Sequence, residues 1–344
     1  MLYHIRCLKP THVFSIDIFN LKTSSIMPLS RFHALRTYLN KVVLGQPVLT
    51  ENLLIALIAN GHLLVEGPPG LAKTRAVKAL CDGVEGDFHR IQFTPDLLPA
   101  DLTGTDIYRS QTGTFEFEAG PIFHNLILAD EINRAPAKVQ SALLEAMAEG
   151  QVTVGKNSYK LPPLFLVMAT QNPLENEGTY PLPEAQLDRF LMHLNLDYPS
   201  GDTEIEILRQ SRKEALTHEL PTTEPIAQAD IFAARDEAME IYLAEPLEKY
   251  IVEIIMATRQ PARYSDELTK WLEYGVSPRA TISLERCARA RAWLHERDFV
   301  SPEDIQAVAP NVLRHRLLLS YQAQAEGVSR DQVINHILTQ VAVP

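Results

Sequence analysis

Residues Gly67–Thr74 read GPPGLAKT and follow a short apolar segment, His62–Glu66. Phosphate groups are bound by backbone N–H groups in a glycine-permitted turn, by a lysine and by a hydroxyl that reaches Mg²⁺. Lys73 and Thr74 supply the lysine and the hydroxyl. The alternative is a glycine- and proline-rich turn with an incidental lysine, but a strand before the stretch and a helix after it favour a phosphate loop. The loop residues predicted to contact a nucleotide are Gly67, Pro68, Pro69, Gly70, Leu71, Ala72, Lys73 and Thr74.

Ala72 is where the stretch departs from the pattern GxxxxGK[ST], because it stands at the position of the second glycine. If Ala72 has ordinary helical dihedral angles, its methyl group costs little. We therefore expect the substitution to leave phosphate binding intact.

A second apolar segment ends in two carboxylates, in the sequence LILADE that closes with Asp130 and Glu131. A phosphate loop works with a carboxylate on a neighbouring strand that holds Mg²⁺ and with a group that orients the attacking water. We predict that Asp130 holds the metal together with Thr74, and that Glu131 is the general base. An apolar strand that ends in Asp-Glu commonly marks only the point where a strand reaches solvent. The phosphate loop upstream favours the catalytic interpretation.

Short apolar segments alternate with helical patterns around these motifs. The helical patterns include Thr74–Asp82 and Ala137–Glu149. Such alternation is typical of a mostly parallel sheet with helices on both faces, so the predicted class is α/β with a five-stranded parallel sheet. The predicted strands are His62–Glu66, Phe88–Phe93, Asn125–Asp130, Leu164–Thr170 and Leu191–Leu196.

Three segments before residue 162 do not follow this alternation. Arg31–Asn60 has helical spacing broken by Gly45 and Pro47, which predicts two helices joined by a turn. Thr112–Glu118 (TGTFEFE) and Gln151–Leu161 (QVTVGKNSYKL) alternate with period two. Each predicts a hairpin that projects from the sheet as an insertion.

After Pro199 the helical patterns dominate and predict a second, all-helical domain. We divide the chain into an extension (residues 1–27), a core (28–219) and a helical domain (220–344), with Leu220–Pro225 as the linker. The clearest helical patterns of the second part are Glu204–Leu216, Glu245–Arg259, Thr281–Glu296 and Pro302–Val308.

Composition narrows the class of protein. The chain has 344 residues, 46% of them hydrophobic and 22% charged, which excludes fibrous and disordered proteins. Its 32 Lys and Arg against 43 Asp and Glu give a net charge of −11, so a nucleic-acid partner is not expected without a local basic patch. Cys7, Cys81 and Cys287 form no CxxC pair, which disfavours a zinc site or a disulfide framework and fits a reducing cytoplasm.

No apolar run reaches the length of about 18–20 residues that spans a bilayer, so no membrane crossing is expected. The first 26 residues carry charges between short apolar clusters, and the pattern does not predict a signal peptide. They are either an extension or the result of a start codon placed too far upstream.

Several long motifs now occur in a recognisable order. ADEINRAPAKVQSALLEAMAEGQVTV (residues 129–154) and ATQNPLENEGTYPLPEAQLDRF (169–190) resemble signatures of MoxR-type AAA+ ATPases, as do VVLGQ (42–46) and GVSPRA (275–280). The resemblance runs from about Val42 to the C-terminus. It implies an AAA+ P-loop core with a small helical lid, ATP and Mg²⁺ as substrate and cofactor, and assembly into a ring, usually a hexamer. It also implies the clade with an insert in the second core helix, in which both hairpins face the central pore.

The same resemblance assigns further catalytic residues. Asn172 in ATQNP matches sensor 1, which contacts the γ-phosphate or the attacking water; a turn asparagine before Pro173 is the alternative. Arg189 in LDRF matches the arginine finger that reaches the nucleotide of a neighbouring subunit, against a surface arginine paired with Asp188. Arg279 in SPRA matches sensor 2, against a solvated charge at a helix end.

Weaker matches concern the base, the subunit boundary and the pore. Val43, Gly45 and Gln46 resemble the segment that lines the adenine pocket, although an ordinary helix–turn–helix fits nearly as well. Three further residues have both a functional and a purely structural interpretation. Arg134 could act across the subunit boundary or be an exposed charge, and the aromatic pair Phe115 and Phe117 could grip a partner or form the packed face of a hairpin.

The expected function is that of an ATP-driven remodelling or maturation factor for partner proteins. The resemblance implies clients or adaptors, among them proteins with von Willebrand factor A domains. The alternatives are the motor subunit of a metal chelatase, a nucleic-acid motor and a nucleotide-dependent switch or scaffold. Charge disfavours the nucleic-acid motor, and the intact set Asp130, Glu131, Asn172 and Arg189 disfavours a switch, because binding alone does not require a water-activating carboxylate.

Overall fold

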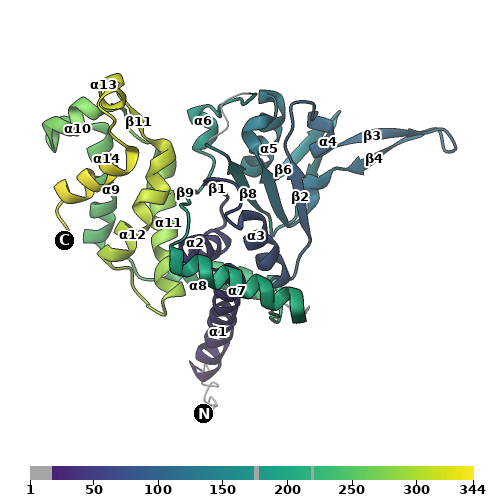
Figure 1. Cartoon of the computed structure of the whole chain (residues 1–344), viewed down its shortest axis with the longest axis horizontal. Helices are drawn as coiled ribbons and strands as arrows, with labels where there is room; N and C mark the ends of the chain where they lie inside the picture. The colour runs from purple at the N-terminus through teal and green to yellow at the C-terminus, as the bar shows by residue number, and fades with distance from the viewer. Residues whose placement is uncertain (1–17, 174–177, 218–220) are drawn as a thin grey trace, which may run out of the picture.

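The computed structural model describes residues 18–173, 178–217 and 221–344 (Figure 1). Most of the predicted extension and residue 220 of the predicted linker lie outside these ranges. The central sheet is wholly parallel and has the predicted five strands. Their spatial order is β2 (Phe88–Gln92), β5 (Leu126–Asp130), β8 (Leu166–Gln171), β1 (Leu63–Glu66) and β9 (Met192–Asn195).

Helices cover both faces of this sheet, which confirms the predicted α/β class. Alternate side chains of β5 enter different cores: Leu126 and Leu128 pack in one, and Ile127 and Ala129 in the other. The first core includes side chains of α2 (Pro47–Ile58) and α3 (Lys73–Asp82). The second includes those of α5 (Ala137–Glu149) and the short α4 (Pro99–Thr103). A strand buried on both faces needs a continuous apolar run, and β5 has one.

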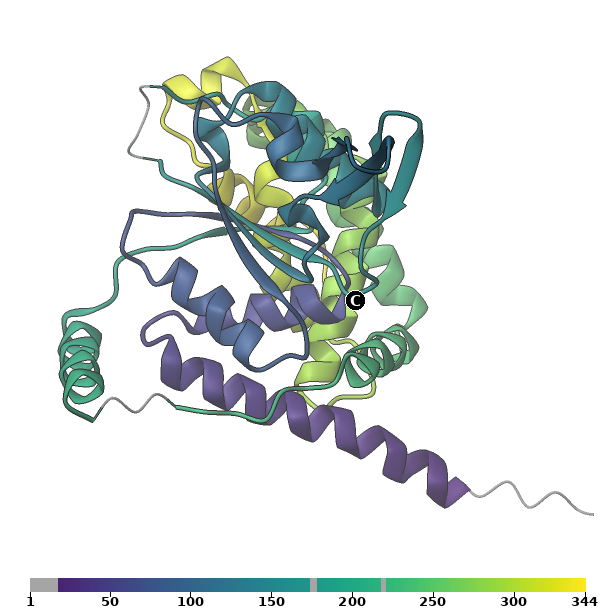
Figure 2. The same cartoon turned by 90° about the vertical axis from the view of Figure 1, so that its right-hand side faces the viewer.

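The long helix α1 (Ile18–Val42) precedes α2, as the pattern before residue 60 predicts. It begins earlier than predicted, and the proposed boundary at residues 27 and 28 falls inside it. Figure 2 shows α1 running along one side of the molecule and beyond it. Phe32 of α1 packs edge-on against Trp293 with the ring centroids 5.2 Å apart, which joins the first helix to the C-terminal helices.

Two hairpins extend from the sheet domain. The first consists of β3 (Gly104–Arg109) and β4 (Thr114–Ala119) and projects far from the body of the molecule (Figure 1). The predicted stretch covers its turn and second strand, whereas the first strand has too few apolar residues to stand out. The second hairpin, β6 (Gln151–Val154) with β7 (Asn157–Lys160), lies where it was predicted. Short 3-10 turns connect these parts: η1 (Pro121–Phe123) and η2 (Ile132–Arg134), with α6 (Glu184–Leu187) before β9.

The C-terminal half is mainly helical, as predicted. Helix α7 (Gly201–Thr217) lies beside the sheet domain and buries none of its residues. The helices that follow are α8 (Gln228–Glu240), α9 (Glu245–Arg259), α10 (Asp266–Trp271), α11 (Pro278–Leu294), α12 (Pro302–Leu313), α13 (Tyr321–Ala325) and α14 (Arg330–Gln340). Two 3-10 turns, η3 (Pro261–Arg263) and η4 (Arg314–Arg316), and a small antiparallel sheet of β10 (Leu272–Tyr274) and β11 (Leu318–Leu319) complete the region.

The helical region shares a core with one face of the sheet domain. Helix α11 buries nine residues, and its small side chains Ala288 and Ala290 allow close packing. Inside the region, the carboxylate of Asp304 is fully buried and accepts hydrogen bonds from Arg291 and Arg297. Among the residues that the structure describes, no helix is both long and apolar enough to cross a membrane.

Candidate nucleotide site

The stretch 67–74 is the loop that connects β1 to α3, at the carboxyl end of β1. Lys73 Nζ donates a hydrogen bond to the backbone oxygen of Gly67 at 2.8 Å, so the loop closes on itself. Burial lowers the pKa of Lys73, while the charges of Asp130 and Glu131 act in the opposite direction. A Cβ at position 67 would lie 2.8 Å from the backbone oxygen of Leu196, so this position requires glycine.

Ala72 does not meet the condition under which its methyl group would cost little. Its φ is +55° and its ψ is 19°, so it has left-handed rather than right-handed helical dihedral angles. This conformation costs a residue with a Cβ roughly 1–2 kcal/mol, and glycine is the residue that adopts it freely. The left-handed conformation therefore explains why the general pattern has glycine at this position. In this chain the residue immediately before Lys73 has a strained backbone.

A cavity of about 450 Å³ lies over this loop. It is lined by the loop from Pro69 to Thr74, by the ends of β5 and β8 and by Arg75 and Arg90. Ligands in open parallel sheets bind beyond the carboxyl ends of the strands, where this cavity lies. The structure thus brings together the predicted residues Lys73, Thr74, Asp130, Glu131 and Asn172.

Asp130 is held by two neighbours that sequence reasoning missed. Its Oδ1 accepts a hydrogen bond of 2.6 Å from the Thr170 hydroxyl, and its Oδ2 accepts one of 2.7 Å from Arg90. Thr74 lines the same cavity, so the available ligands are a hydroxyl and a carboxylate. Hard oxygen donors of this kind suit Mg²⁺, so these residues fit the metal that the fold implies.

Glu131 has a strained backbone and an ordered side chain. Its φ is +58°, an unusual value for a residue with a Cβ, and such strain is common at functional sites. The carboxylate accepts a hydrogen bond of 2.8 Å from Gln92 and lies 3.1 Å from Arg134 Nε. Arg134, considered above for the subunit boundary, is thus paired with Glu131 of its own chain. The sequence feature that could have identified Gln92 is its position as a polar residue at the end of strand β2.

Asn172 follows β8 directly and is 8% exposed. It lines the phosphate cavity and also a second cavity of about 340 Å³ that continues toward the helical region. This second cavity includes Glu66 and His193, whose Oε2 and Nε2 atoms are 3.0 Å apart. This close approach of His193 lowers the pKa of Glu66, against the opposing effect of burial. Asn172 therefore stands between the nucleotide site and the helical region.

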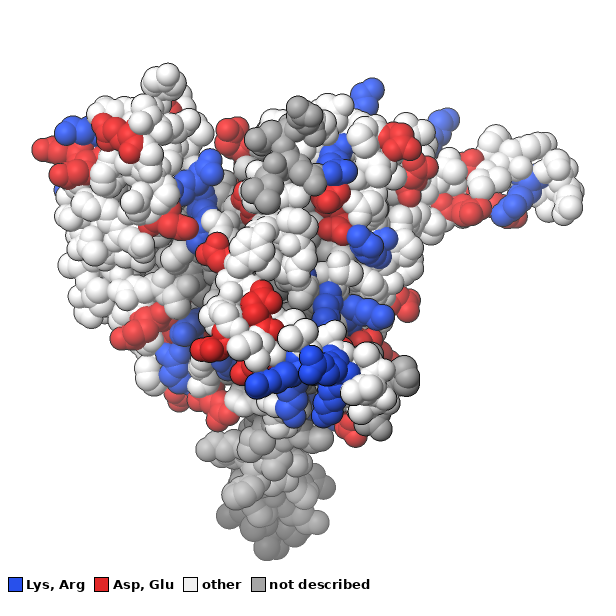
Figure 3. Space-filling view, viewed as in Figure 1, with Lys and Arg blue, Asp and Glu red and all other residues white. Residues whose placement is uncertain are grey.

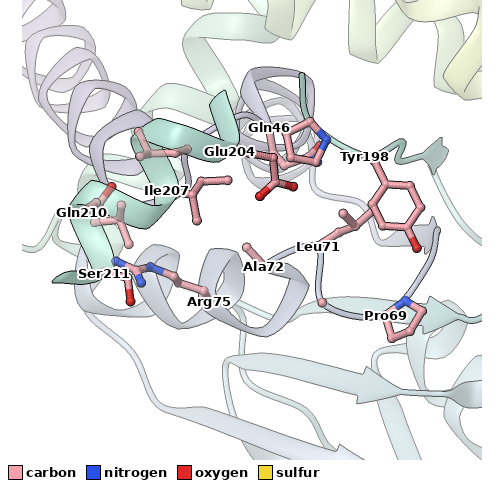
Figure 4. A pocket seen from close by; sticks show the side chains of 14 residues that line it. Gln46, Pro69, Leu71, Ala72, Arg75, Tyr198, Glu204, Ile207, Gln210 and Ser211 are labelled. Carbon is pink, nitrogen blue, oxygen red and sulfur yellow. The ribbon is translucent and has the colours of Figure 1, made fainter. Parts of the chain in front are cut away.

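A third cavity, of about 420 Å³, adjoins the phosphate loop between the loop and α7 (Figure 4). Gln46, one of the three residues predicted for the adenine pocket, lines this cavity. Val43 is buried in the core, and Gly45 forms a left-handed turn in which a Cβ would lie 2.6 Å from Thr203. Sequence reasoning missed the lining residues beside Val43, before α7 and in α7 itself. They are Val42, Leu44, Tyr198, Glu204, Ile207, Gln210 and Ser211.

Arg189 and Arg279 lie outside all three of these cavities. Arg189 Nη1 donates to the backbone oxygen of Leu144 at 2.7 Å. Asp188 does not take Arg189 as its partner but binds Arg316 of η4, with 2.8 Å between Arg316 Nε and Asp188 Oδ1. Its other oxygen accepts a hydrogen bond of 2.8 Å from Ser277, the residue that caps α11 two positions before Arg279. The hydrogen bond between Ser277 and Asp188 therefore links the segments that carry the two predicted arginines, and neither arginine lines the cavity over the phosphate loop.

The aromatic residues of the first hairpin have different surroundings. Phe117 stacks on Tyr159 of the second hairpin, with 3.8 Å between ring centroids and 12° between planes. Phe115 is 70% exposed and contacts Tyr108 across the hairpin. Figure 3 shows acidic side chains along this hairpin and a far end that is mostly uncharged. Phe117 thus joins the two hairpins, and Phe115 is the more exposed residue of the predicted aromatic pair.

Comparisons with known proteins agree with this geometry. The family model described as "ATPase family associated with various cellular activities (AAA)" matches residues 62–192, and a model described as "AAA lid domain" matches residues 269–337. The chain is 45% identical to the protein named Chaperone MoxR1 of Mycobacterium tuberculosis, over 88% of this chain and 80% of that protein. A solved protein from Cytophaga hutchinsonii superposes with a TM-score of 0.89 and 46% identity, covering 96% of this chain and 100% of that one.

A more distant similarity bears on one alternative. The magnesium-chelatase 38 kDa subunit of Acidiphilium rubrum is 29% identical over 60% of this chain and 57% of that protein. Both the identity and the coverage are well below those of the first group of relatives.

Proposed function

Because this chain belongs to the MoxR family of AAA+ ATPases, we propose that it hydrolyses ATP in a ring of subunits and uses the cycle to remodel partner proteins. The observation that carries the proposal is the single cavity that collects Lys73, Thr74, Asp130, Glu131 and Asn172. These residues come from the carboxyl ends of two parallel strands, β5 and β8, and from the loop that follows a third strand, β1. They are the groups that phosphoryl transfer to water requires.

The phosphate loop would hold the β- and γ-phosphates. The loop leads directly into α3, whose dipole favours negative charge at this end, and Lys73 would exchange its hydrogen bond with Gly67 for phosphate oxygens. Thr74 and Asp130 would hold Mg²⁺, which when bound neutralises charge on the phosphate oxygens. Arg90 must then share Asp130 with the metal, because it already binds one carboxylate oxygen.

Glu131 is the proposed general base. Its carboxylate lines the phosphate cavity and is oriented by Gln92 and Arg134. A general base must lie within hydrogen-bond reach of the proton that it removes, and Glu131 would accept that proton from water in the cavity. Asn172, held at the cavity wall by the end of β8, would orient the water or the γ-phosphate.

Arg189 is proposed to act on the nucleotide of a neighbouring subunit, and Arg279 to couple the angle of the lid to the γ-phosphate. Both lie outside the cavities of their own chain, and Asp188 and Ser277 join the segments that carry them. An arginine supplied by a partner stabilises charge in the transition state and typically raises kcat by 10³–10⁵. We infer a ring, with six subunits as in most proteins that the motifs resemble, because the last subunit must complete the site of the first.

The cavity between the loop and α7 is the proposed site of the adenine base. Gln46 offers a polar group and Ile207 an apolar surface, and both lie across the cavity from Leu71 and Ala72 (Figure 4). The position of Val43 in the core moves the predicted base contact to its neighbours Val42 and Leu44. Arg75 lines the cavity and pairs with Glu214 of α7. This ion pair would hold α3 and α7 at a fixed separation, so bases of different size would meet the same two walls.

The two hairpins are the proposed contact with clients, as the insert clade would place them at the pore. Phe115 supplies an exposed aromatic side chain at the projecting end, and the Phe117–Tyr159 stack would make the hairpins move together. The client or adaptor is a protein, with von Willebrand factor A domains as one class. Cysteine usage fits a cytoplasmic site of action.

Two alternatives are less well supported. A motor of the metal-chelatase type would use the same core, but that similarity is lower and covers less of the chain. A switch with little turnover would not need Glu131 to be held in a strained conformation beside the phosphate site. We therefore place the chain with the remodelling ATPases, keeping residues 28–219 as core and 220–344 as lid; the two matched family models fall one in each part.

Steady-state ATP hydrolysis measured against protein concentration tests the proposal, with Glu131→Gln as the matched control. Activity per subunit should rise with concentration, because the active site is complete only between subunits, and the control should be inactive while still binding ATP. Absence of turnover at every concentration, or equal turnover in the control, would refute an ATPase that uses this site.

A further inference from the structure

The residues around Arg189 are held by side chains that the proposed mechanism does not use. They come from η4 (Arg314–Arg316), which follows the long helix α12 in the helical region. The segment they contact, residues 188–193, contains Arg189 and the start of β9, and we call it the finger segment. The contacts join positions more than 120 apart in the sequence.

Arg316 makes the most contacts. Its side chain is 2% exposed, and its guanidinium donates to Asp188 Oδ1 at 2.8 Å. It also donates to the backbone oxygens of Phe190 at 2.6 Å and Leu191 at 3.1 Å. A guanidinium has five N–H groups in one plane, and this one directs most of them at residues on both sides of Arg189.

The other two residues of η4 extend this contact along β9. His315 donates from Nε2 to the backbone oxygen of Phe190 at 3.1 Å, and burial keeps its pKa well below the ordinary value, so its ring is neutral. Arg314 donates to the backbone oxygen of His193 at 2.5 Å and pairs with Asp331 of α14 at 2.8 Å.

The position of β9 explains why such contacts matter. It is the edge strand of the sheet, with β1 as its neighbour in the strand order. An edge strand has backbone groups that the sheet does not satisfy, and these groups need other partners. The side chains of η4 supply these partners. The helical region therefore fixes the edge of the sheet next to Arg189.

Asp188 connects this contact with Arg279. One of its oxygens binds Arg316, and the other accepts the hydrogen bond from Ser277. Ser277 also caps α11, because its hydroxyl accepts from the backbone N–H of Arg279 at 3.2 Å. A single carboxylate therefore ties the residue before Arg189 to the start of the helix that carries Arg279.

We propose that Arg316, acting through Asp188, is a positioning residue for Arg189, and that it makes the finger segment and the helical region move as one unit. A movement of the helical region in one subunit would then reach the nucleotide of its neighbour directly. The inference rests on the proposed function, in which Arg189 acts in trans.

The test is Arg316→Lys, which keeps the positive charge but loses the planar fork. A misplacement of about 1 Å in a catalytic group can cost 10²-fold in rate, so kcat for ATP should fall about 10- to 100-fold. The KM for ATP should change less than about threefold, since Arg316 lines neither the phosphate cavity nor the base cavity of its own chain. Arg297→Lys is the matched control, because Arg297 binds Asp304 and Ser301 within the helical region.

Mixed rings separate positioning from loss of structure. Rings that combine Arg316→Lys with Glu131→Gln subunits should regain activity, because the first supplies an intact Glu131 and the second an intact finger. Ring assembly is measured by size-exclusion chromatography at the same concentrations. Unchanged kcat in Arg316→Lys, or no recovery in rings shown to be mixed, would overturn the inference.

Two further variants make the outcome unambiguous. If Arg316→Lys does not fold, Asp188→Asn addresses the same link with a side chain of the same shape, and it should lower kcat and recover in mixed rings; unchanged kcat would overturn the inference. Arg189→Ala separates the two proposals. If it is fully active, the proposed trans mechanism fails; if it is inactive and rescued while Arg316→Lys and Asp188→Asn are normal, only the positioning role fails.

Discussion

The phosphate loop and the finger segment are proposed to serve one active site from two subunits, and the chain holds them in opposite ways. The loop is closed by a bond between Lys73 and Gly67, six positions apart, and by the start of its own helix. The finger segment is held by Arg316, 128 positions from Asp188. In the proposed mechanism, phosphate binding therefore depends on local structure, whereas catalysis between subunits depends on the packing of the whole chain.

Removing the side chain of the finger should have the largest effect. We expect Arg189→Ala to lower kcat about 10³-fold or more, since a finger arginine typically contributes that much, while nucleotide affinity stays within about threefold. Single-turnover ATPase assays and equilibrium binding of a fluorescent ATP analogue check this. Weakened binding equal to the loss of turnover would place Arg189 in its own nucleotide site and remove the contrast.

Removing the lysine of the loop should affect binding first. Hydrogen bonds to charged groups contribute about 1.5–3 kcal/mol, so Lys73→Ala should weaken ATP affinity by about 100-fold. The Lys73→Ala subunit keeps Arg189. Mixed rings of Lys73→Ala and Arg189→Ala subunits should therefore hydrolyse ATP, as measured by a coupled ATPase assay. Near-native affinity in Lys73→Ala would show that the phosphates bind elsewhere.

Acid should weaken the sheet beneath the loop. His62 precedes β1, is buried, and accepts a hydrogen bond from the backbone N–H of Val167 at 3.1 Å. Burial lowers the pKa of His62 to about 4, below the value of about 6.5 in an unfolded chain. The unfolded state therefore takes up a proton first, and stability is lost as pH falls through 6.5 toward 4.

Between pH 7.5 and 5 this linkage amounts to about 2 kcal/mol. Urea unfolding at both pH values should show that the native chain loses about that much more stability than His62→Gln, which cannot titrate. Equal losses would mean that His62 is protonated in the folded state. The difference in stability loss would show how far the phosphate loop depends on the contact between His62 and Val167 across the sheet.

The smallest effect is expected at Ala72. Glycine relieves the left-handed strain but adds conformational entropy to the unfolded chain, so Ala72→Gly should stabilise by at most about 1 kcal/mol. Thermal unfolding of the nucleotide-free chain measures it, with Ala76→Gly inside α3 as a control that should destabilise. A lower melting temperature for Ala72→Gly would mean that packing of the methyl group outweighs the strain.

Prediction from sequence worked where the signal lies within a few residues. The bounds of α5 and α9 agree with the predicted ranges, and the strand positions differ by one or two residues. It failed for β3, β10 and β11, because their polar or very short sequences lack the alternation that marks a strand. It left the dihedral angles of Ala72 open, and the structure shows them to be left-handed.

For the site, the predictions for Lys73, Asp130 and Glu131 rest on motifs, and the structure places all three at one cavity. The partners of these residues could not be predicted in this way. Gln92 and Arg90 reach them from another strand, and no spacing rule connects such pairs. The pairing of Asp188 with Arg316 instead of Arg189 likewise depends on how the helical region packs.

The sequence by itself determined the alternation of strands and helices, the phosphate loop and the two carboxylates that follow β5. These features depend on hydrogen bonds and apolar periodicities between residues close together in the chain, so their pattern can be read directly. Only the tertiary structure decided which residues orient Glu131, which residues line the cavity beside α7 and what holds the finger segment. Those contacts join distant residues, and their geometry follows from the packing of the sheet against the helical region.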